Sequence, residues 1–97
     1  MRFEWDERKA ASNEAKHGIS FGGAITAFDD PFGLVASDPG HSTPSEERRW
    51  LIGESDCGVL VVVFTIRDPG QVHRLISARR ASRKERAQYE QGKRVPL

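Results

Sequence analysis

The spacing of hydrophobic residues predicts one strand and two helices in the N-terminal third of the chain. Residues 1–5 alternate between polar and apolar side chains, and their two aromatic residues are expected to anchor the core. Asp6 is a good N-cap for a helix over residues 7–17, and Gly18 stands where a left-handed C-cap is favoured. Ser20 can cap a second helix. Its apolar stripe has the spacing i, i+3, i+4 and i+7 and comprises Phe21, Ala24, Ile25 and Phe28.

The remainder of the chain predicts four strands and a final helix. The strands are expected at residues 33–37, 48–54, 59–66 and 71–81, separated by segments rich in turn-forming residues. The nearly continuous apolar run at 59–66 indicates a central strand that is covered on both faces. Ser82 and Glu85 form a capping box that opens a helix extending to about Gly92.

These elements predict an α+β fold with the order β-α-α-β-β-β-β-α, in which helices pack on an antiparallel sheet. The chain has 97 residues, which is the size of one domain. We place that domain at residues 1–92 and expect a flexible C-terminal tail at residues 93–97.

Composition favours a folded protein of a reducing compartment. The longest mainly apolar run, at residues 59–66, has eight residues including Thr65, well below the roughly 20 that a membrane-spanning helix needs. The first six residues include two acids, which a signal peptide would not carry, and the chain has a single cysteine. We therefore expect a cytoplasmic protein that does not associate with a membrane.

Charge is distributed unevenly along the chain. Residues 1–66 contain six Lys or Arg against eleven Asp or Glu, whereas residues 67–97 contain nine basic residues against three acidic ones. Seven of those nine are Arg, whose planar guanidinium suits bidentate contact with phosphate. A basic C-terminal third of this kind is expected to meet a polyanion, most readily RNA. The alternative is a solvated face of alternating charges.

The last predicted strand carries arginine on both faces. With a period of two, one face presents His73, Leu75, Ser77 and Arg79, and the other presents Val72, Arg74, Ile76, Ala78 and Arg80. An unpaired buried arginine costs several kcal/mol, so Arg74 must meet a ligand or an acid such as Glu47 or Glu54. Together with Arg48 and Arg49 of the neighbouring strand, these arginines can converge on one phosphate-binding patch.

No metal site or cofactor is expected from the sequence. The three histidines, at positions 17, 41 and 73, lie far apart and lack carboxylates or cysteines at ligand spacing. The glycines do not form a phosphate-binding fingerprint between a strand and a helix.

Several segments together resemble the BrnT family of toxins from bacterial toxin-antitoxin pairs, in order and over nearly the whole chain. The N-terminal matches are Phe3-Glu4-Trp5-Asp6, Lys9, Asn13, Lys16-His17-Gly18-Ile19-Ser20-Phe21, Ala24, Phe28 and Asp30-Pro31. The later matches are Arg48-Arg49, Ile52-Gly53, residues 60–65, residues 74–81, Glu85 and Tyr89. The resemblance implies a RelE-like fold and a ribonuclease that inhibits growth. It also implies a BrnA-like antitoxin that binds operator DNA and holds the toxin in a hetero-oligomer.

For such an enzyme we expect metal-independent cleavage of RNA, in which the 2′-hydroxyl attacks the phosphate. The reaction requires proton transfer and positive charge at the phosphorane. The expected catalytic residues are Lys16, His17, Arg48 and Arg79. The expected substrate-binding residues are Arg49, Arg74, His73, Ser77 and Arg80.

Other interpretations of the same residues remain open at this point. His17 can be a helix C-terminal residue favoured by the helix dipole, in which case His73 is the substitute for proton transfer. The whole chain can be a non-catalytic module that binds a repressor. A plain RNA-binding domain is disfavoured because one Tyr and two Trp offer few stacking surfaces.

Overall fold

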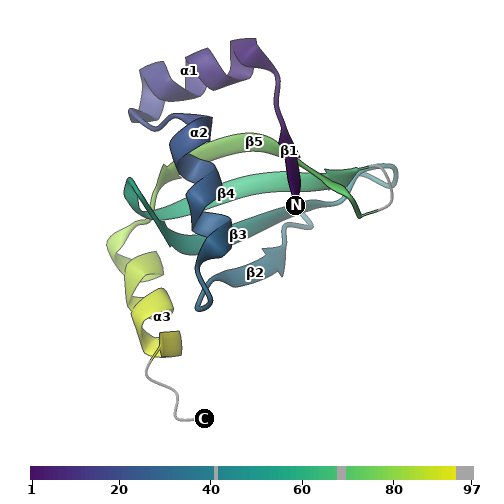
Figure 1. The fold of residues 1–97 in the computed structure, drawn as a ribbon. Coiled ribbons are helices and arrows are strands. Elements are labelled where there is room, and N and C mark those ends of the chain that lie inside the picture. Colours follow the sequence, from purple (N-terminus) through teal and green to yellow (C-terminus); the bar gives the residue numbers. More distant parts are fainter. Residues whose placement is uncertain (41, 68–69, 94–97) are drawn as a thin grey trace.

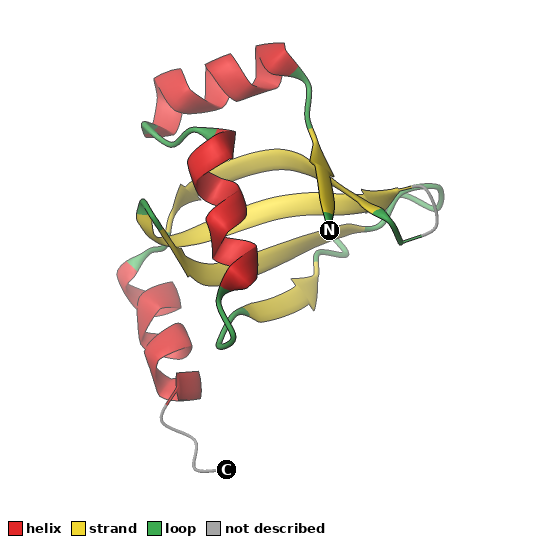
Figure 2. Ribbon diagram, in the orientation of Figure 1, coloured by secondary structure: helices red, strands yellow, loops and turns green. Residues whose placement is uncertain are grey.

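A computed structural model describes residues 1–40, 42–67 and 70–93, which form an α+β fold (Figures 1 and 2). The α+β class predicted from the sequence is confirmed. In chain order the elements are β1 (Arg2–Glu4), α1 (Glu7–His17), α2 (Phe21–Ala24), the 3-10 helix η1 (Ile25–Asp29), β2 (Leu34–Ser37), β3 (Arg48–Ser55), β4 (Gly58–Arg67), β5 (Val72–Arg80) and α3 (Arg83–Lys93).

The five strands form one mixed sheet in the order β1-β5-β4-β3-β2. The strands from β2 to β5 pair antiparallel with their sequence neighbours, whereas β1 pairs in parallel with β5. The predicted fully antiparallel sheet is therefore wrong. Between β1 and β2 the chain passes through α1, α2 and η1, so no hairpin constrains the direction of β1. The prediction that the apolar run lies in the central strand is confirmed by the position of β4.

The caps predicted for the first two helices are present. The Asp6 carboxylate accepts hydrogen bonds from the backbone N–H groups of Arg8 and Lys9, and Gly18 adopts φ 71°. The Ser20 hydroxyl accepts the Gly23 N–H at 3.0 Å. The second helix is shorter than predicted, because it tightens into η1 after one turn.

The main core lies between one face of the sheet and the layer formed by α1, α2 and η1 (Figure 1). Close packing there requires Gly53, since a Cβ at this position would lie 2.9 Å from the Ala27 carbonyl oxygen of η1. A second cluster beneath α3 joins Ile52, Val61 and Tyr89 on the opposite face. Because α3 covers only one end of that face, Val63 of β4 is only half-buried. The central strand is thus covered fully on one face and partly on the other.

A β-bulge divides β5 into two parts. Phe64 of β4 pairs with Leu75, and the preceding Val63 pairs with Ser77, so Ile76 is an extra residue in β5. Before the bulge, Leu75 packs into the main core. After it, Ala78 takes that orientation and Ser77 turns to the other face. The prediction that one face carries His73, Leu75, Ser77 and Arg79 is therefore wrong.

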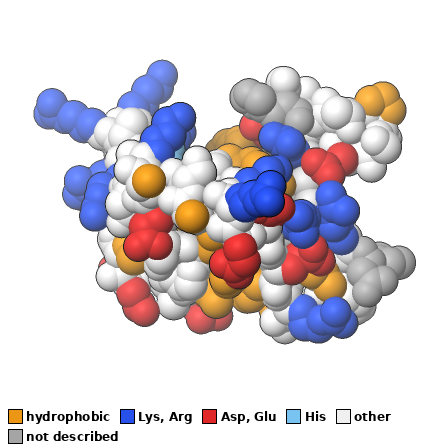
Figure 3. Space-filling model, turned by 90° about the horizontal axis from the view of Figure 1, so that it is seen from above, with side chains coloured by type: hydrophobic (Ala, Val, Ile, Leu, Met, Phe, Trp, Pro, Cys, Tyr) orange, Lys and Arg blue, Asp and Glu red, His pale blue; other side chains and the backbone are white. Residues whose placement is uncertain are grey.

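The capping box that opens α3 is confirmed, and the helix runs to Lys93, one residue into the predicted tail. Residues 94–97 of that tail lie outside the described residues, as do His41 and residues 68–69 of the predicted turn. Within the described ranges, no helix is long and apolar enough to cross a membrane. Seen from the side of α1, basic and acidic side chains are interspersed on the surface (Figure 3).

Asn13 of α1 joins the helix layer to the edge of β5. β1 pairs only with residues 72–74 of β5, which leaves the later part of β5 at the edge of the sheet. The buried Asn13 amide donates to the carbonyl oxygens of Ala78, at 2.8 Å, and Ile19, at 3.0 Å, and it accepts the Ala78 N–H at 3.0 Å. One side chain thus satisfies both backbone groups of Ala78, as a neighbouring strand would.

We expect Asn13→Ala to lower the free energy of unfolding by at least about 2 kcal/mol, because it leaves buried backbone groups of Ala78 without partners. Urea denaturation followed by circular dichroism measures the change. Ser12→Ala on the exposed side of α1 is the control and should have little effect. Equal stability of the two variants would contradict the role assigned to Asn13.

Candidate functional site

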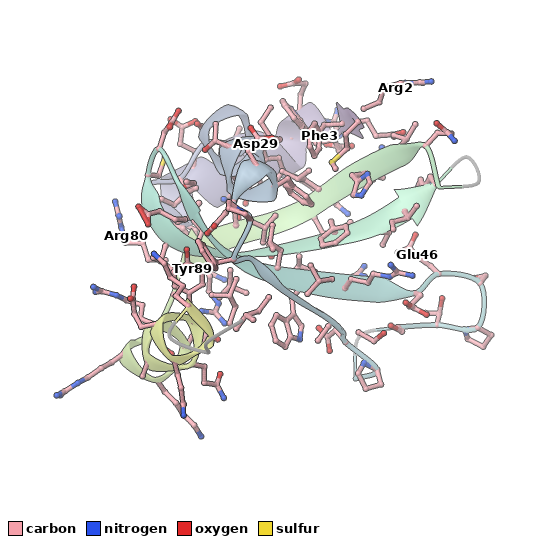
Figure 4. All side chains as sticks on the ribbon, turned by 60° about the horizontal axis from the view of Figure 1, so that its bottom comes forward. Arg2, Phe3, Asp29, Glu46, Arg80 and Tyr89 are labelled. Atoms are coloured by element: carbon pink, nitrogen blue, oxygen red, sulfur yellow. The ribbon has the colours of Figure 1, made fainter. Side chains whose placement is uncertain are left out.

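The sheet face opposite α1 and α2 carries an open groove of about 470 Å³ beside α3. Figure 4 shows α3, which carries Tyr89, at one end of the sheet and on the side away from Asp29 of η1. Its floor is apolar and its rim is polar and charged. The groove is lined by Asp38, Arg48, Trp50, Ile52, Val61, Val63, Ile76, Ser77, Arg79, Glu85 and Gln88. We call this feature the groove.

Strand alternation and the bulge together bring these side chains to one face. Residues 48, 50 and 52 of β3 share a face because successive side chains alternate. Cross-strand pairing places Trp50 beside Val63 and Val63 beside Ser77. The bulge directs Ser77 and Arg79 into the groove, so arginines from strands on either side of β4 border the same hollow.

Arg79 is held in place by the first turn of α3. Its guanidinium makes a bidentate ion pair with Glu85, with distances of 2.7 and 2.9 Å to the two carboxylate oxygens. Glu85 also accepts the Ser82 N–H, so one carboxylate caps the helix and orients the arginine. The Arg79 hydrogen bond to Glu85 lowers the pKa of Glu85 to about 2 and raises the pKa of Arg79.

Arg79 keeps donors for a ligand in spite of this ion pair. Two of its five N–H groups bind Glu85, and a third points to the Arg80 carbonyl oxygen at 3.3 Å. Its side chain is 43% exposed, so the N–H groups that bind no residue of the described ranges can reach an anion in the groove.

Arg48 on the other side of the groove is held more loosely. Its Nε lies 3.5 Å from a carboxylate oxygen of Glu46, whose second oxygen binds Arg67 at 2.8 Å. The backbones of β3 and β5 are separated by two strand spacings, about 10 Å, across the sheet. Arg48 lies opposite Thr65 of β4 and Arg79 lies opposite Val61, so the two arginines are also offset by about 13 Å along the strands, and their backbones are about 16 Å apart. Only extended arginine side chains that point toward each other can contact one phosphate between them, and otherwise they contact different phosphates of one strand.

Three other predicted phosphate-binding arginines contact partners outside the groove. Arg74 forms an ion pair with Glu4 of β1, so the structural alternative for this residue is confirmed, although the acid is neither Glu47 nor Glu54. Arg49 points to the opposite face and binds Glu47 at 2.8 Å. Arg80 donates to the Cys57 carbonyl oxygen at 3.0 Å. Arginines from separate strands do meet at one groove, but of the five arginines considered only Arg48 and Arg79 line it.

His73 lies in an aromatic cluster on the core side of the sheet. Its ring stacks on Phe64 with a centroid distance of 5.5 Å and contacts Phe3 and Phe28 at 5.9 and 5.6 Å. Within the described part of the chain, its buried Nδ1 has no hydrogen-bond partner. Burial lowers the pKa of His73, and the positive charges of the N-terminus and Arg49 lower it further. These contacts indicate a structural role for His73.

Lys16 and His17 end α1 and do not line the groove. They follow Asn13 by three and four residues, so they share its side of the helix, and His17 is half-buried there. Asn13 binds Ala78, the residue before Arg79. The two candidates for proton transfer therefore lie toward the edge of the strand that carries Arg79, outside the groove itself.

Trp50 and Gln88 are groove residues that the sequence interpretation missed. Trp50 follows Arg48 by two positions in a predicted strand, and that alternation alone would have placed the two side chains on one face. Gln88 has no comparable signal, because its position depends on how α3 docks on the sheet. Across the described segments, no three His, Cys, Asp or Glu side chains form a group that could hold a metal ion.

The comparisons with known proteins identify one family. A family model described as a ribonuclease toxin, BrnT, of type II toxin-antitoxin systems matches residues 5–85. No curated protein matches the chain. The matched segment contains every described residue that lines the groove except Gln88.

The environment of His73 predicts a pH-dependent stability. Its pKa is lower in the folded protein, so the unfolded chain binds a proton more readily and stability is lost as the pH falls below about 6.5. In His73→Phe this contribution is absent. We expect the free energy of unfolding, measured in urea at pH 7 and pH 5, to fall more in the unsubstituted protein than in the variant. The same fall in both proteins would rule out this account of His73.

Proposed function

Since the chain belongs to the BrnT family of ribonuclease toxins of type II toxin-antitoxin systems, we propose that its groove binds and cleaves RNA without a metal ion. The observation that carries the proposal is the approach of Arg48 and Arg79 to one groove from strands on either side of β4. Guanidinium groups supply the bidentate contacts that a phosphodiester takes. We also propose that the fold is RelE-like and that the protein is cytoplasmic.

The proposed reaction uses the RNA itself as the nucleophile. The 2′-oxygen attacks the adjacent phosphorus as its proton leaves to a base, and the bond from phosphorus to the 5′-oxygen breaks as that oxygen gains a proton. The products are a 2′,3′-cyclic phosphate and a 5′-hydroxyl. Positive charge at the phosphorane stabilises the transition state, and the N–H groups of Arg48 and Arg79 that bind no described residue are suited to supply it.

For proton transfer we propose His17, with Lys16 beside it. α1 packs on the sheet face opposite the groove, so this assignment requires the RNA to pass from the groove over the edge of β5. α1 and β5 run in the same direction in Figure 1, so their C-terminal ends lie at the same end of the sheet. The Asn13 contact with Ala78 holds α1 against that part of β5. Histidine is the side chain best suited to proton exchange near neutral pH. If His17 serves only to stabilise the C-terminal end of α1 through the helix dipole, the His17→Gln variant should remain active.

Among the other proposed substrate contacts, the geometry favours Ser77. Its side chain borders the groove on the same strand as Arg79, where a hydroxyl can donate to a phosphate oxygen. Arg49, Arg74, Arg80 and His73 have contacts elsewhere, so they are weaker candidates.

A type II toxin has an antitoxin protein as its partner. We propose that this partner is BrnA-like, binds operator DNA and covers the groove in a hetero-oligomer. The half-buried arginines of the groove and the exposed arginines of α3 are suited to attract acidic groups of such a partner, with an association rate that falls as salt rises.

Growth arrest by the induced chain tests the groove as the toxic site. Arg79→Ala should relieve arrest, because loss of one charged donor at a developing anion costs about 10²- to 10³-fold in rate. Arg83→Ala, an exposed arginine of α3 that does not line the groove, is the matched control and should remain toxic. Full toxicity of a folded and equally abundant Arg79→Ala variant would remove Arg79 from the site.

The ends of the RNA fragments test the chemistry. The purified chain should cleave RNA in EDTA and leave 2′,3′-cyclic phosphate or 3′-phosphate together with 5′-hydroxyl ends, and it should leave DNA intact. End-group analysis with and without the chelator measures this. Fragments with 5′-phosphate ends, or loss of cleavage in EDTA, would show that water and a metal ion perform the attack.

A further inference from the structure

Trp50 stands in the groove in a position that phosphate binding alone does not explain. One part of its side chain packs on the cluster of Ile52, Val61 and Tyr89 beneath α3. It remains half-buried and borders two hollows, the groove on one side and a smaller depression beside Gln88 and Gly92 on the other. A large planar ring is thus anchored by the protein and still accessible to a ligand.

The surroundings of Trp50 match the parts of one nucleotide. Arg48 is two residues away on the same face of β3, a spacing of about 7 Å along the strand. A phosphate held by Arg48 can therefore place its own base over the indole. Val63 and Ile76 offer an apolar floor, and the Gln88 amide offers both a donor and an acceptor at the rim.

We propose that Trp50 is a stacking platform for one unpaired base, so that the groove selects single-stranded RNA. The inference rests on the proposed ribonuclease function and assigns a base subsite to the same groove. Every base has a π face, so stacking tolerates many sequences, while Gln88 can contact the polar edge of the base. A base within a duplex is stacked and paired, and its face is not available to the indole.

The fluorescence of Trp50 reports directly on such stacking. The chain has two tryptophans, and Trp5 packs against Phe21 beside the main core, so Trp5→Phe leaves Trp50 as the single tryptophan, which is excited selectively at wavelengths that tyrosine does not absorb. The probe is a mixed-sequence single-stranded RNA with 2′-fluoro groups, which lacks the attacking hydroxyl. It should quench Trp50 fluorescence in a saturable manner. A duplex of the same strand should bind without comparable quenching.

Substitution at Trp50 measures its contribution to affinity. Trp50→Leu should weaken binding of the 2′-fluoro strand roughly 10- to 100-fold, and Trp50→Phe should retain part of the affinity, because a smaller ring still stacks. Urea denaturation of both variants accounts for any loss of folded protein, since Trp50 also packs on the cluster beneath α3.

The outcomes separate the base subsite from the function on which it depends. If Arg79→Ala weakens RNA binding but Trp50→Leu does not, and Trp50 fluorescence is unchanged by RNA, the base subsite is wrong and the proposed function stands. Equal quenching by the duplex also overturns the subsite. If the unsubstituted chain neither binds nor cleaves RNA, both proposals fail.

Discussion

The extra residue at the bulge of β5 determines what each face of this sheet presents. Without it, strict alternation would direct Ser77 and Arg79 into the core with His73 and Leu75. With it, Leu75 and Ala78 both pack inward although they are three residues apart, and Ser77 and Arg79 reach the groove. β1 pairs only before the bulge, and Asn13 takes over the backbone groups of Ala78 after it. The backbone hydrogen-bonding groups at the edge of β5 are therefore paired by β1 before the bulge and, at Ala78, by the Asn13 side chain after it.

The groove owes its chemistry to side chains that the fold holds in place. Glu85 belongs to the capping box of α3 and also makes the bidentate contact with Arg79, so the first turn of the helix orients the arginine. A guanidinium that is already oriented loses less rotamer freedom when it binds a phosphate. Tyr89 hydrogen-bonds Asp30, which ties α3 to the turn after η1 and keeps the helix at one end of the sheet. The rest of that face is left open.

Local signals in the sequence predicted the helices and the central strand well. Asp6, Gly18, Ser20 and the Ser82–Glu85 box act within a few residues, and their hydrogen bonds follow from residue type and spacing. The long apolar run of β4 marked the centre of the sheet for a similar reason. Family membership was also evident from short matches spread along the chain.

Features that depend on distant contacts were not predictable in this way. Arg74 pairs with Glu4, 70 residues earlier, because β1 joins β5 in parallel. No local pattern marks a bulge, so a period of two put His73 and Arg79 on one face. The groove exists because α3 covers only part of the sheet, and that depends on tertiary packing. Of the nine predicted site residues, Arg48, Arg79 and Ser77 line the groove, and the remaining six lie elsewhere.

The central claim is that RNA binds on the sheet face beside α3. Nuclear magnetic resonance of the labelled chain, titrated with single-stranded 2′-fluoro RNA, tests it most directly. The account predicts chemical-shift changes concentrated at the backbone amides of groove residues, among them Arg48, Trp50, Ser77 and Arg79. Changes confined to α1 and α2, with the groove amides unaffected, would contradict it.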